Sequence, residues 1–180
     1  ESVNDIPVVN DLDYDVLEDG IVSVFPDGDD IEESILEFVY SQPSHGQISE
    51  VSWFVTYTPD SDFNGEDSFT YRAFDGEDYS EEAIINILVL PDNDSPIITN
   101  IEDQTINEGD NFFYILESDD IDQDPLSYSY EVNQDVTASI NGDLLTILFG
   151  SDYNGDVDIT VTVSDGEFSD SDSFTISVIP

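Results

Sequence analysis

Asp, Glu and Asn side chains recur in short motifs along the chain, and their oxygen atoms are the ligands that calcium prefers in proteins. An Asn-Asp-x-Pro sequence occurs twice, in SVNDIP at residues 2–7 and in PDNDSP at residues 91–96. DFNG and DYNG occupy residues 62–65 and 152–155, and an Asp-x-Asp-x-Asp string occupies residues 120–124. Isolated Asp-Gly and Asn-Gly pairs are ordinary hairpin turns. These motifs therefore indicate a site only where several of them come together.

The charge of the chain favours cations as partners. It holds 44 Asp and Glu residues against one Lys or Arg, for a formal net charge of -43. This field would repel nucleic acid and anionic membrane surfaces, so we expect no nucleic-acid binding and no membrane insertion. Two interpretations of the acidity remain. The acids form a solvated surface adapted to salty or cold water, or a subset of them is arranged to bind calcium.

We expect the chain to fold despite its charge. Apolar residues make up 38% of it and aromatic residues 12%, which argues against the disorder that high charge otherwise suggests. These residues alternate with polar ones, for example over residues 69–73 and 159–163. Such alternation predicts strands with one buried and one solvated face. No segment has a convincing helical period, apart from one possible turn over residues 30–36, so the prediction is an all-β chain.

An internal repeat divides the sequence in two. Residues 62–91 match residues 152–180 with one deletion, and the Asn-Asp-x-Pro motif recurs at the same period of about 90 residues. That period is a common size for a small β-sandwich. We predict a tandem pair of homologous domains, residues 1–94 and 95–180. If each has seven antiparallel strands, the first and last strands run in the same direction, and the domains join end to end.

Successive antiparallel strands alternate in direction, so counting them (strand parity) shows at which end of a domain each loop lies. This count assigns acidic loops from both domains to the junction, with PDNDSP between them. The assigned residues are Glu18, Asp62 and Asn64 from the exit loops of the first domain, and Asp120, Asp122 and Asp165 from the entrance loops of the second. Calcium takes 6 to 8 oxygen ligands at roughly 2.3–2.6 Å, which such a convergence without nearby Lys or Arg would supply. Magnesium is less suited because it keeps its waters.

The sequence resembles the cadherin-like repeats of bacteria, including the dystroglycan-type and VCBS-type tandem modules of large secreted and surface proteins. The similar stretches are DIDQDPLSYS at residues 120–129, QPSHGQI at 42–48 and YTPDSDFNGEDSFTYRAFDGE at 57–77, with the two Asn-Asp-x-Pro linkers. The resemblance covers nearly all of the chain. It implies a seven-stranded Greek-key sandwich in each domain and two or three calcium ions at each junction.

The resemblance also implies a set of calcium ligands at this junction. They are Glu18, Asp62, Asn64, Asp92, Asn93, Asp94, Asp120, Asp122 and Asp165. In FPDGDD of the first domain, Phe25 stands where the family usually has its first Asp, which weakens a site at that domain's own entrance. Half a site is expected there, from Asn4, Asp5, Asp27, Asp29 and Asp75. Another half-site awaits a following repeat, on Glu108, Asp152 and Asn154.

Catalysis has little support in the sequence, and we expect no enzyme activity. His45 is the only His and lies in a Pro-Ser-His-Gly turn, where a surface turn residue is the simplest interpretation. The chain has no Cys nucleophile, no HExxH motif and no phosphate-binding Gly loop. Trp53, Phe54 and Tyr57 are more often core residues than a platform for sugars.

Two function classes remain. The first is a calcium-stiffened structural or adhesive array of an extracellular, secreted or cell-surface protein. Its partners would be calcium, the neighbouring repeats of the same chain, and a like domain or a polysaccharide. The second is a carbohydrate-binding accessory module of a secreted polysaccharide-degrading enzyme. Such a module should expose aromatic residues, whereas here most of them occupy the inward positions of the alternation, which favours the array.

The absence of Met predicts that the sequence is a fragment or processed region, with any export signal in another part of the protein.

Overall fold

The structure is a computed structural model that describes residues 4–32, 35–134 and 136–180. These residues form strands, turns and loops, and none of them is helical. Within the same ranges there is accordingly no helix of the length and apolarity needed to cross a membrane. The possible helical turn over residues 30–36 falls partly outside the described residues, and residues 31–32 form a non-helical turn. The all-β prediction is confirmed.

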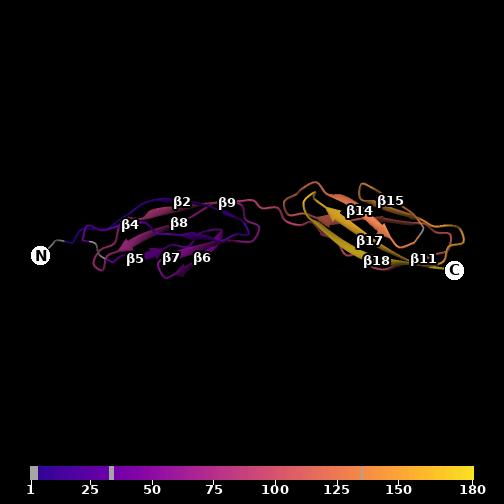
Figure 1. The fold of residues 1–180 in the computed structure, drawn as a ribbon, viewed down its shortest axis with the longest axis horizontal. Coiled ribbons are helices and arrows are strands. Elements are labelled where there is room, and N and C mark those ends of the chain that lie inside the picture. Colours follow the sequence, from indigo (N-terminus) through magenta and orange to yellow (C-terminus); the bar gives the residue numbers. More distant parts are fainter. Residues whose placement is uncertain (1–3, 33–34, 135) are drawn as a thin grey trace. The chain divides into compact units, whose positions relative to one another are not determined.

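The chain divides into two units, unit 1 (Glu1–Asp92) and unit 2 (Asn93–Pro180). In unit 1 a four-stranded sheet has the order β2-β9-β8-β5 and a three-stranded sheet the order β3-β7-β6, with β1 and β4 as a short extra pair. Figure 1 labels most of these strands. The strands are β1 (Val8–Val9), β2 (Leu12–Leu17), β3 (Val22–Val24), β4 (Gly28–Asp29), β5 (Glu37–Tyr40), β6 (Gly46–Val51), β7 (Phe54–Pro59), β8 (Gly65–Phe74) and β9 (Ala83–Leu90). The first long strand, β2, is parallel to the last, β9, as predicted.

Unit 2 has the same topology, with sheet orders β11-β18-β17-β14 and β12-β16-β15 and the short pair β10 and β13. Its strands are β10 (Ile97–Ile98), β11 (Gln104–Asn107), β12 (Phe112–Ile115), β13 (Ser118–Asp119), β14 (Ser127–Val132), β15 (Thr137–Asn141), β16 (Leu144–Leu148), β17 (Gly155–Ser164) and β18 (Ser169–Ile179). Here β11 is parallel to β18. The prediction of two tandem seven-stranded sandwiches is confirmed.

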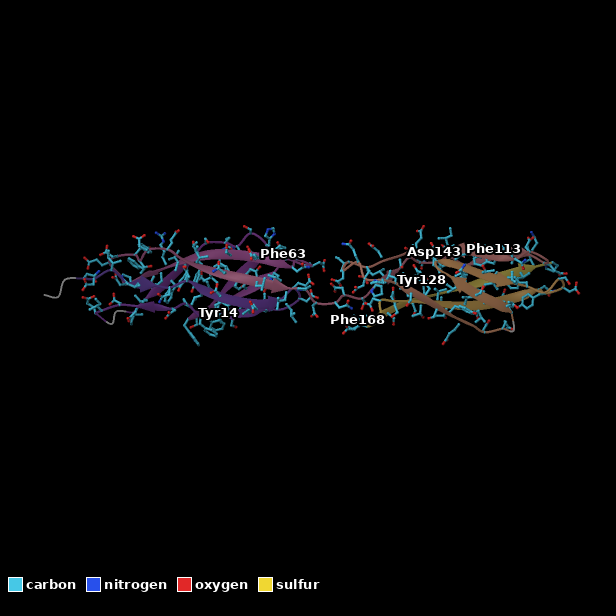
Figure 2. All side chains as sticks on the ribbon, turned by 90° about the horizontal axis from the view of Figure 1, so that it is seen from above. Tyr14, Phe63, Phe113, Tyr128, Asp143 and Phe168 are labelled. Atoms are coloured by element: carbon cyan, nitrogen blue, oxygen red, sulfur yellow. The ribbon has the colours of Figure 1, made fainter. Side chains whose placement is uncertain are left out.

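Alternating burial gives each unit its own core. Along β9 the residues alternate strictly between buried and exposed, as the period-two pattern predicts. In unit 2, Ile147 of the three-stranded sheet and Ile159 of the four-stranded sheet are both fully buried in one cluster. Burying such a side chain contributes roughly 1.5–3 kcal/mol. Side chains that end in oxygen atoms project from the outer surfaces of both units (Figure 2).

Asp67 is a charged residue on the inward face of β8, and it is only 7% exposed. Its carboxylate accepts hydrogen bonds from the backbone N–H groups of Ser44 and His45, each at 3.0 Å, and from Oη of Tyr57 at 2.9 Å. Burial raises the pKa of Asp67, but these hydrogen bonds outweigh it and lower the pKa below the ordinary value of 3.8. Unit 2 has the apolar Val157 at the equivalent position of β17. Asp67 therefore anchors the turn before β6 from within the core of unit 1.

The Asp67→Asn variant is expected to destabilise unit 1 by about 2 kcal/mol, because hydrogen bonds to a charged acceptor contribute about 1.5–3 kcal/mol and an amide nitrogen accepts none. The pKa of Asp67 is lowered in the folded state. Its contribution is therefore present above the ordinary pKa and is lost as the pH falls through the lowered one. Urea unfolding followed by Trp53 fluorescence measures it, since the chain has one Trp.

The matched control is Asp15→Asn, which removes one charge at an exposed position of β2. A destabilisation by Asp67→Asn no larger than that of the control, or one that persists unchanged at acid pH, would contradict the anchoring role.

Candidate metal centre

Glu18 organises the predicted ligands of unit 1. It lies in the loop between β2 and β3 and is 3% exposed. Its Oε1 accepts a hydrogen bond from the backbone N–H of Asp92 at 2.8 Å, and its Oε2 accepts one from Nδ2 of Asn64 at 3.2 Å. Its own N–H donates to the carbonyl of Leu90 at 3.0 Å, which ties the loop to the end of β9. The structure thus brings together Glu18, Asn64 and Asp92.

Asp62 is placed differently from these three residues. It is exposed, and its φ of 58° lies in the left-handed region, which Asp adopts more readily than most residues. Among the described residues no hydrogen bond links Asp62 to Glu18, Asn64 or Asp92. Its carboxylate is available to solvent or to a cation.

The linker and the loops of unit 2 are held together by two hydrogen bonds. Nδ2 of Asn93 donates to Oδ2 of Asp165 at 3.0 Å, and the backbone N–H of Asp94 donates to Oδ2 of Asp122 at 2.8 Å. A carboxylate oxygen of Asp94 and one of Asp122 lie within 4.8 Å of each other. The structure therefore brings together the linker residues and the predicted ligands from two loops of this unit.

Asp165 is held in its charged form. The hydrogen bond from the Asn93 side chain and one from the backbone N–H of Glu167 lower the pKa of Asp165 below 3.8, against the opposing effect of burial. A second backbone donor, Phe168, contacts the same carboxylate oxygen as Glu167, at 2.7 Å. Calcium ligands must be deprotonated, and Asp165 meets this condition at neutral pH.

Asp120 has a buried carboxylate, and among the described residues only one of its two oxygen atoms accepts a hydrogen bond. The residue is 7% exposed, and its Oδ1 accepts a hydrogen bond from the backbone N–H of Asp124 at 3.2 Å. Its Oδ2 is buried without a hydrogen-bond partner among the described residues. A buried, unpaired carboxylate oxygen is costly. A positive charge beside Oδ2 would remove that cost.

The entrance loops of unit 1 repeat the arrangement of unit 2. Nδ2 of Asn4 donates to Oδ2 of Asp75 at 3.0 Å, as Asn93 does to Asp165. The backbone N–H of Asp5 donates to Oε2 of Glu32 at 3.3 Å, which corresponds to the bond of Asp94 with Asp122. These contacts gather three members of the predicted half-set, Asn4, Asp5 and Asp75, around the first Asn-Asp-x-Pro motif, and calcium binding there stays a prediction.

The members of that half-set from FPDGDD differ from those expected. Strand pairing aligns Val8 with Asp29 and Ile97 with Asp119, so the counterpart of Asp120 is the next residue, Asp30, which is also buried. Glu32 then corresponds to Asp122. Asp29 is exposed in β4, and Asp27 accepts a hydrogen bond from the side chain of Asn10 at 3.1 Å.

Sequence reasoning missed Asp30 and Glu32 because FPDGDD offers Asp27 and Asp29 at a similar spacing. The signal that identifies them is their distance from the Asp-Gly-Glu motif: Asp30 precedes Asp75 by the same number of residues as Asp120 precedes Asp165. On this alignment Phe25 does not replace a ligand.

Among the described residues, the predicted ligands in the exit loops of unit 2 accept fewer hydrogen bonds than those of unit 1. Glu108, Asp152 and Asn154 are all exposed. The backbone N–H of Glu108 donates to the carbonyl of Ile179 at 2.7 Å, which repeats the bond of Glu18 with Leu90. The loop is positioned as in unit 1, but among the described residues its carboxylate accepts no hydrogen bond comparable with those on Glu18.

Known proteins resemble the chain in sequence or in fold. A family model described as a bacterial Ig domain matches residues 4–88 and again residues 93–179. The human protocadherin-24 EC1-2 structure (Form II) is similar with a TM-score of 0.62 at 14% identity, covering 98% of this chain and 99% of that one. Human mucin-like protocadherin EC1-2 gives a TM-score of 0.55 at 14% identity, covering 97% and 98%. At these identities the likeness concerns the fold alone.

A third similarity covers only a part of a longer protein. The endo-fucoidan hydrolase MfFcnA4 from glycoside hydrolase family 107 matches 97% of this chain at 20% identity, with a TM-score of 0.41. The chain spans 29% of the length of that enzyme. No curated protein sequence matches the chain significantly.

The two family matches fall one in each unit and together account for nearly the whole chain. The cadherin-like fold predicted from the sequence is confirmed by the two protocadherin structures. The chain belongs to the bacterial Ig domain family, of which it contains two tandem copies.

Proposed function

We propose that the two units are structural or adhesive repeats of an extracellular protein, stiffened by calcium bound where PDNDSP connects them. The observation that carries the proposal is the carboxylate of Asp120, whose Oδ2 is buried without a hydrogen-bond partner among the described residues. The linker residues and Asp122 lie in the same group of loops, and the chain offers a single Lys or Arg side chain, Arg72, to neutralise any of its acids. A divalent cation is the natural counter-charge.

The proposed ligands have two origins. Unit 2 contributes Asn93, Asp94, Asp120, Asp122 and Asp165, and unit 1 contributes Glu18, Asp62, Asn64 and Asp92. The hydrogen bonds within each unit support this division, because they fix the linker residue Asp94 against Asp122 and hold Asp92 against Glu18. All these groups offer hard oxygen atoms, which calcium binds in large numbers and in flexible geometry.

Bound calcium would act on the linker between the units. Free of metal, the carboxylates repel one another, and the linker is free to bend. When calcium is bound, the same carboxylates become attractive contacts from both units to one charge, and bending would break them. Repeats of this kind are suited to span distance or to present binding surfaces outside the cell, and a like domain or a polysaccharide is the candidate partner. We propose no catalytic role.

Unit 1 presents the same set of side chains at its own entrance, from Asn4, Asp5, Asp30, Glu32 and Asp75. Glu32 is one methylene longer than Asp122, so we expect a weaker or displaced ligand at that position. The repeated contacts support an array in which each unit offers one half of a calcium site at each end. We propose that the units are repeats similar to the dystroglycan-type and VCBS-type modules.

Calorimetric titration of the whole chain with calcium chloride tests the proposal. In about 1 M sodium chloride the Debye length is only about 3 Å, so the general field of the acids is screened. We expect saturable binding with stoichiometric heat to persist in that salt, and magnesium to give a much weaker response. If the heat disappears under screening, the acidity is a solvated surface and the proposal fails.

A further inference from the structure

Three aromatic rings form an exposed cluster at one turn of unit 1. Trp53 is 67% exposed and Phe25 is 44% exposed, and their ring centroids lie 5.2 Å apart. Phe54 lies 5.3 Å from each of them. The sequence interpretation of these aromatics as core residues is right for Tyr57, which is fully buried, but wrong for Trp53. The cluster also accounts for Phe25, the residue of FPDGDD that the calcium ligands leave unexplained.

Unit 2 shows that the fold does not require this cluster. Val51 pairs with Phe54 across the two-residue turn of unit 1, as Asn141 pairs with Leu144 in unit 2. Trp53 therefore corresponds to Asp143, an exposed residue at the surface of unit 2 (Figure 2).

The same turn is locally strained in unit 1. Its first residue, Ser52, has a φ of 57°, where unit 2 has Gly142 with a φ of 65°. A non-Gly side chain at this φ is uncommon, and backbone strain clusters at functional positions. Unit 1 therefore keeps an exposed Trp on a turn with unfavourable backbone geometry, although the equivalent turn of unit 2 folds with Gly and Asp.

A groove with a volume of about 360 Å³ opens beside this turn. It lies between β5, the edge of the four-stranded sheet, and β6, the edge of the three-stranded sheet. Trp53, Phe54 and Tyr40 supply aromatic surface, and the carboxylates of Glu37 and Glu50 supply negative charge. The volume falls in the range of roughly 300–1,000 Å³ that is typical of binding pockets.

The charge of the groove is intrinsic to its lining. Burial, together with the smaller effect of the nearby carboxylate of Glu50, raises the pKa of Tyr40 to about 12. The Tyr40 hydroxyl is therefore a neutral hydrogen-bonding group at physiological pH. Glu37 and Glu50 are both exposed, and no Lys or Arg lines the groove.

We propose that this groove binds a Lys- or Arg-bearing segment of a partner protein. Carboxylates accept hydrogen bonds from ammonium and guanidinium groups, and aromatic faces attract the same cations. The strongly negative field of the chain would also speed the approach of a basic partner. A neutral sugar could stack on Trp53, but it would leave the negative charges of Glu37 and Glu50 unused.

The chain already contains one cation bound by an aromatic ring and a carboxylate. A second copy of the chain is not a suitable partner for the groove. Its only Lys or Arg residue, Arg72, lies 5.2 Å over the ring of Tyr79 and 3.8 Å from the carboxylate of Glu82. One cation is thus already held by a ring and a carboxylate together. A second copy of the chain would bring 44 acids against one Lys or Arg, so its approach to the groove would be repelled.

Fluorescence of Trp53 tests the proposal directly, since it is the only Trp of the chain. The whole chain, saturated with calcium, is titrated with an amidated Gly-Arg-Gly-Arg-Gly peptide, and a Gly-Ser-Gly-Ser-Gly peptide serves as the neutral probe. We expect a saturable change with the Arg peptide only. Glu37→Gln with Glu50→Gln should weaken binding by about tenfold or more, since both charges contact the cation.

The matched control is Glu81→Gln with Glu131→Gln, which makes the same change of charge at two exposed positions outside the groove. Equal weakening in both double variants would mean that only the general field attracts the peptide, and the proposal fails. It also fails if cellohexaose or maltohexaose saturates the Trp53 signal and the Arg peptide does not, because the groove would then be a sugar site. The proposal is independent of calcium binding, so the unmodified chain in EDTA should show the same preference for the Arg peptide.

Discussion

Calcium at about 100 times its dissociation constant is expected to stabilise the chain by about 2.7 kcal/mol, and the Asp94→Asn/Asp122→Asn variant to lose most of that gain. The two carboxylates lie within 4.8 Å of each other, and the backbone of one donates to the side chain of the other. The two amide side chains keep the size of the carboxylates and one acceptor oxygen each, but they remove two negative charges from the surroundings of the proposed ion. The measurement is the shift of the melting temperature between EDTA and calcium chloride.

Differential scanning calorimetry suits this test because two units can unfold in separate transitions. The control variant is Glu131→Gln with Asp143→Asn, which removes two charges at exposed positions of unit 2. It should retain the full calcium shift of the unmodified chain. If both variants lose the shift equally, calcium acts through the net charge and not through a site at Asp94 and Asp122.

The fold was predictable because its signals are repeated and local. Alternation over residues 69–73 predicted a strand buried on one face, and the structure shows that pattern in β8. Matching motifs in the two halves predicted one topology twice, and β2 and β11 each pair in parallel with the last strand of their unit. Strand parity then placed Glu18 in the loop after β2, where the structure has it.

The remaining features depend on contacts between distant segments. Asp30 could not be distinguished from Asp27 and Asp29 by the spacing of acids within FPDGDD, and besides the distance to the Asp-Gly-Glu motif it is the pairing of β1 with β4 that aligns it with Asp120. Asp67 occupies an inward position that alternation assigns to an apolar residue, and its stabilising donors come from a turn more than 20 residues earlier in the chain. The exposure of Trp53 follows from a turn register that its apolar neighbours do not reveal.

The effect of Asp120→Asn on the stability of unit 2 is expected to change sign when calcium is added. In EDTA the buried Oδ2 of Asp120 has no hydrogen-bond partner among the described residues, so replacing the charge by a neutral amide should stabilise unit 2 by about 1 kcal/mol. In calcium chloride the same variant should destabilise it by about 2 kcal/mol or more, because removing one partner of a buried charge pair is strongly unfavourable. Asn keeps an acceptor for the backbone N–H of Asp124.

Such a change of sign between EDTA and calcium distinguishes a metal ligand from a carboxylate that only supports the fold. A residue that only holds its loop would be destabilising under both conditions, and a mere surface charge would have little effect under either. Asp143→Asn, which removes one exposed charge in the same unit, should have that small effect on stability, with the same sign in EDTA and in calcium. If Asp120→Asn lowers the melting temperature equally in EDTA and in calcium, the buried carboxylate serves the fold of unit 2, and calcium binding must depend on other residues.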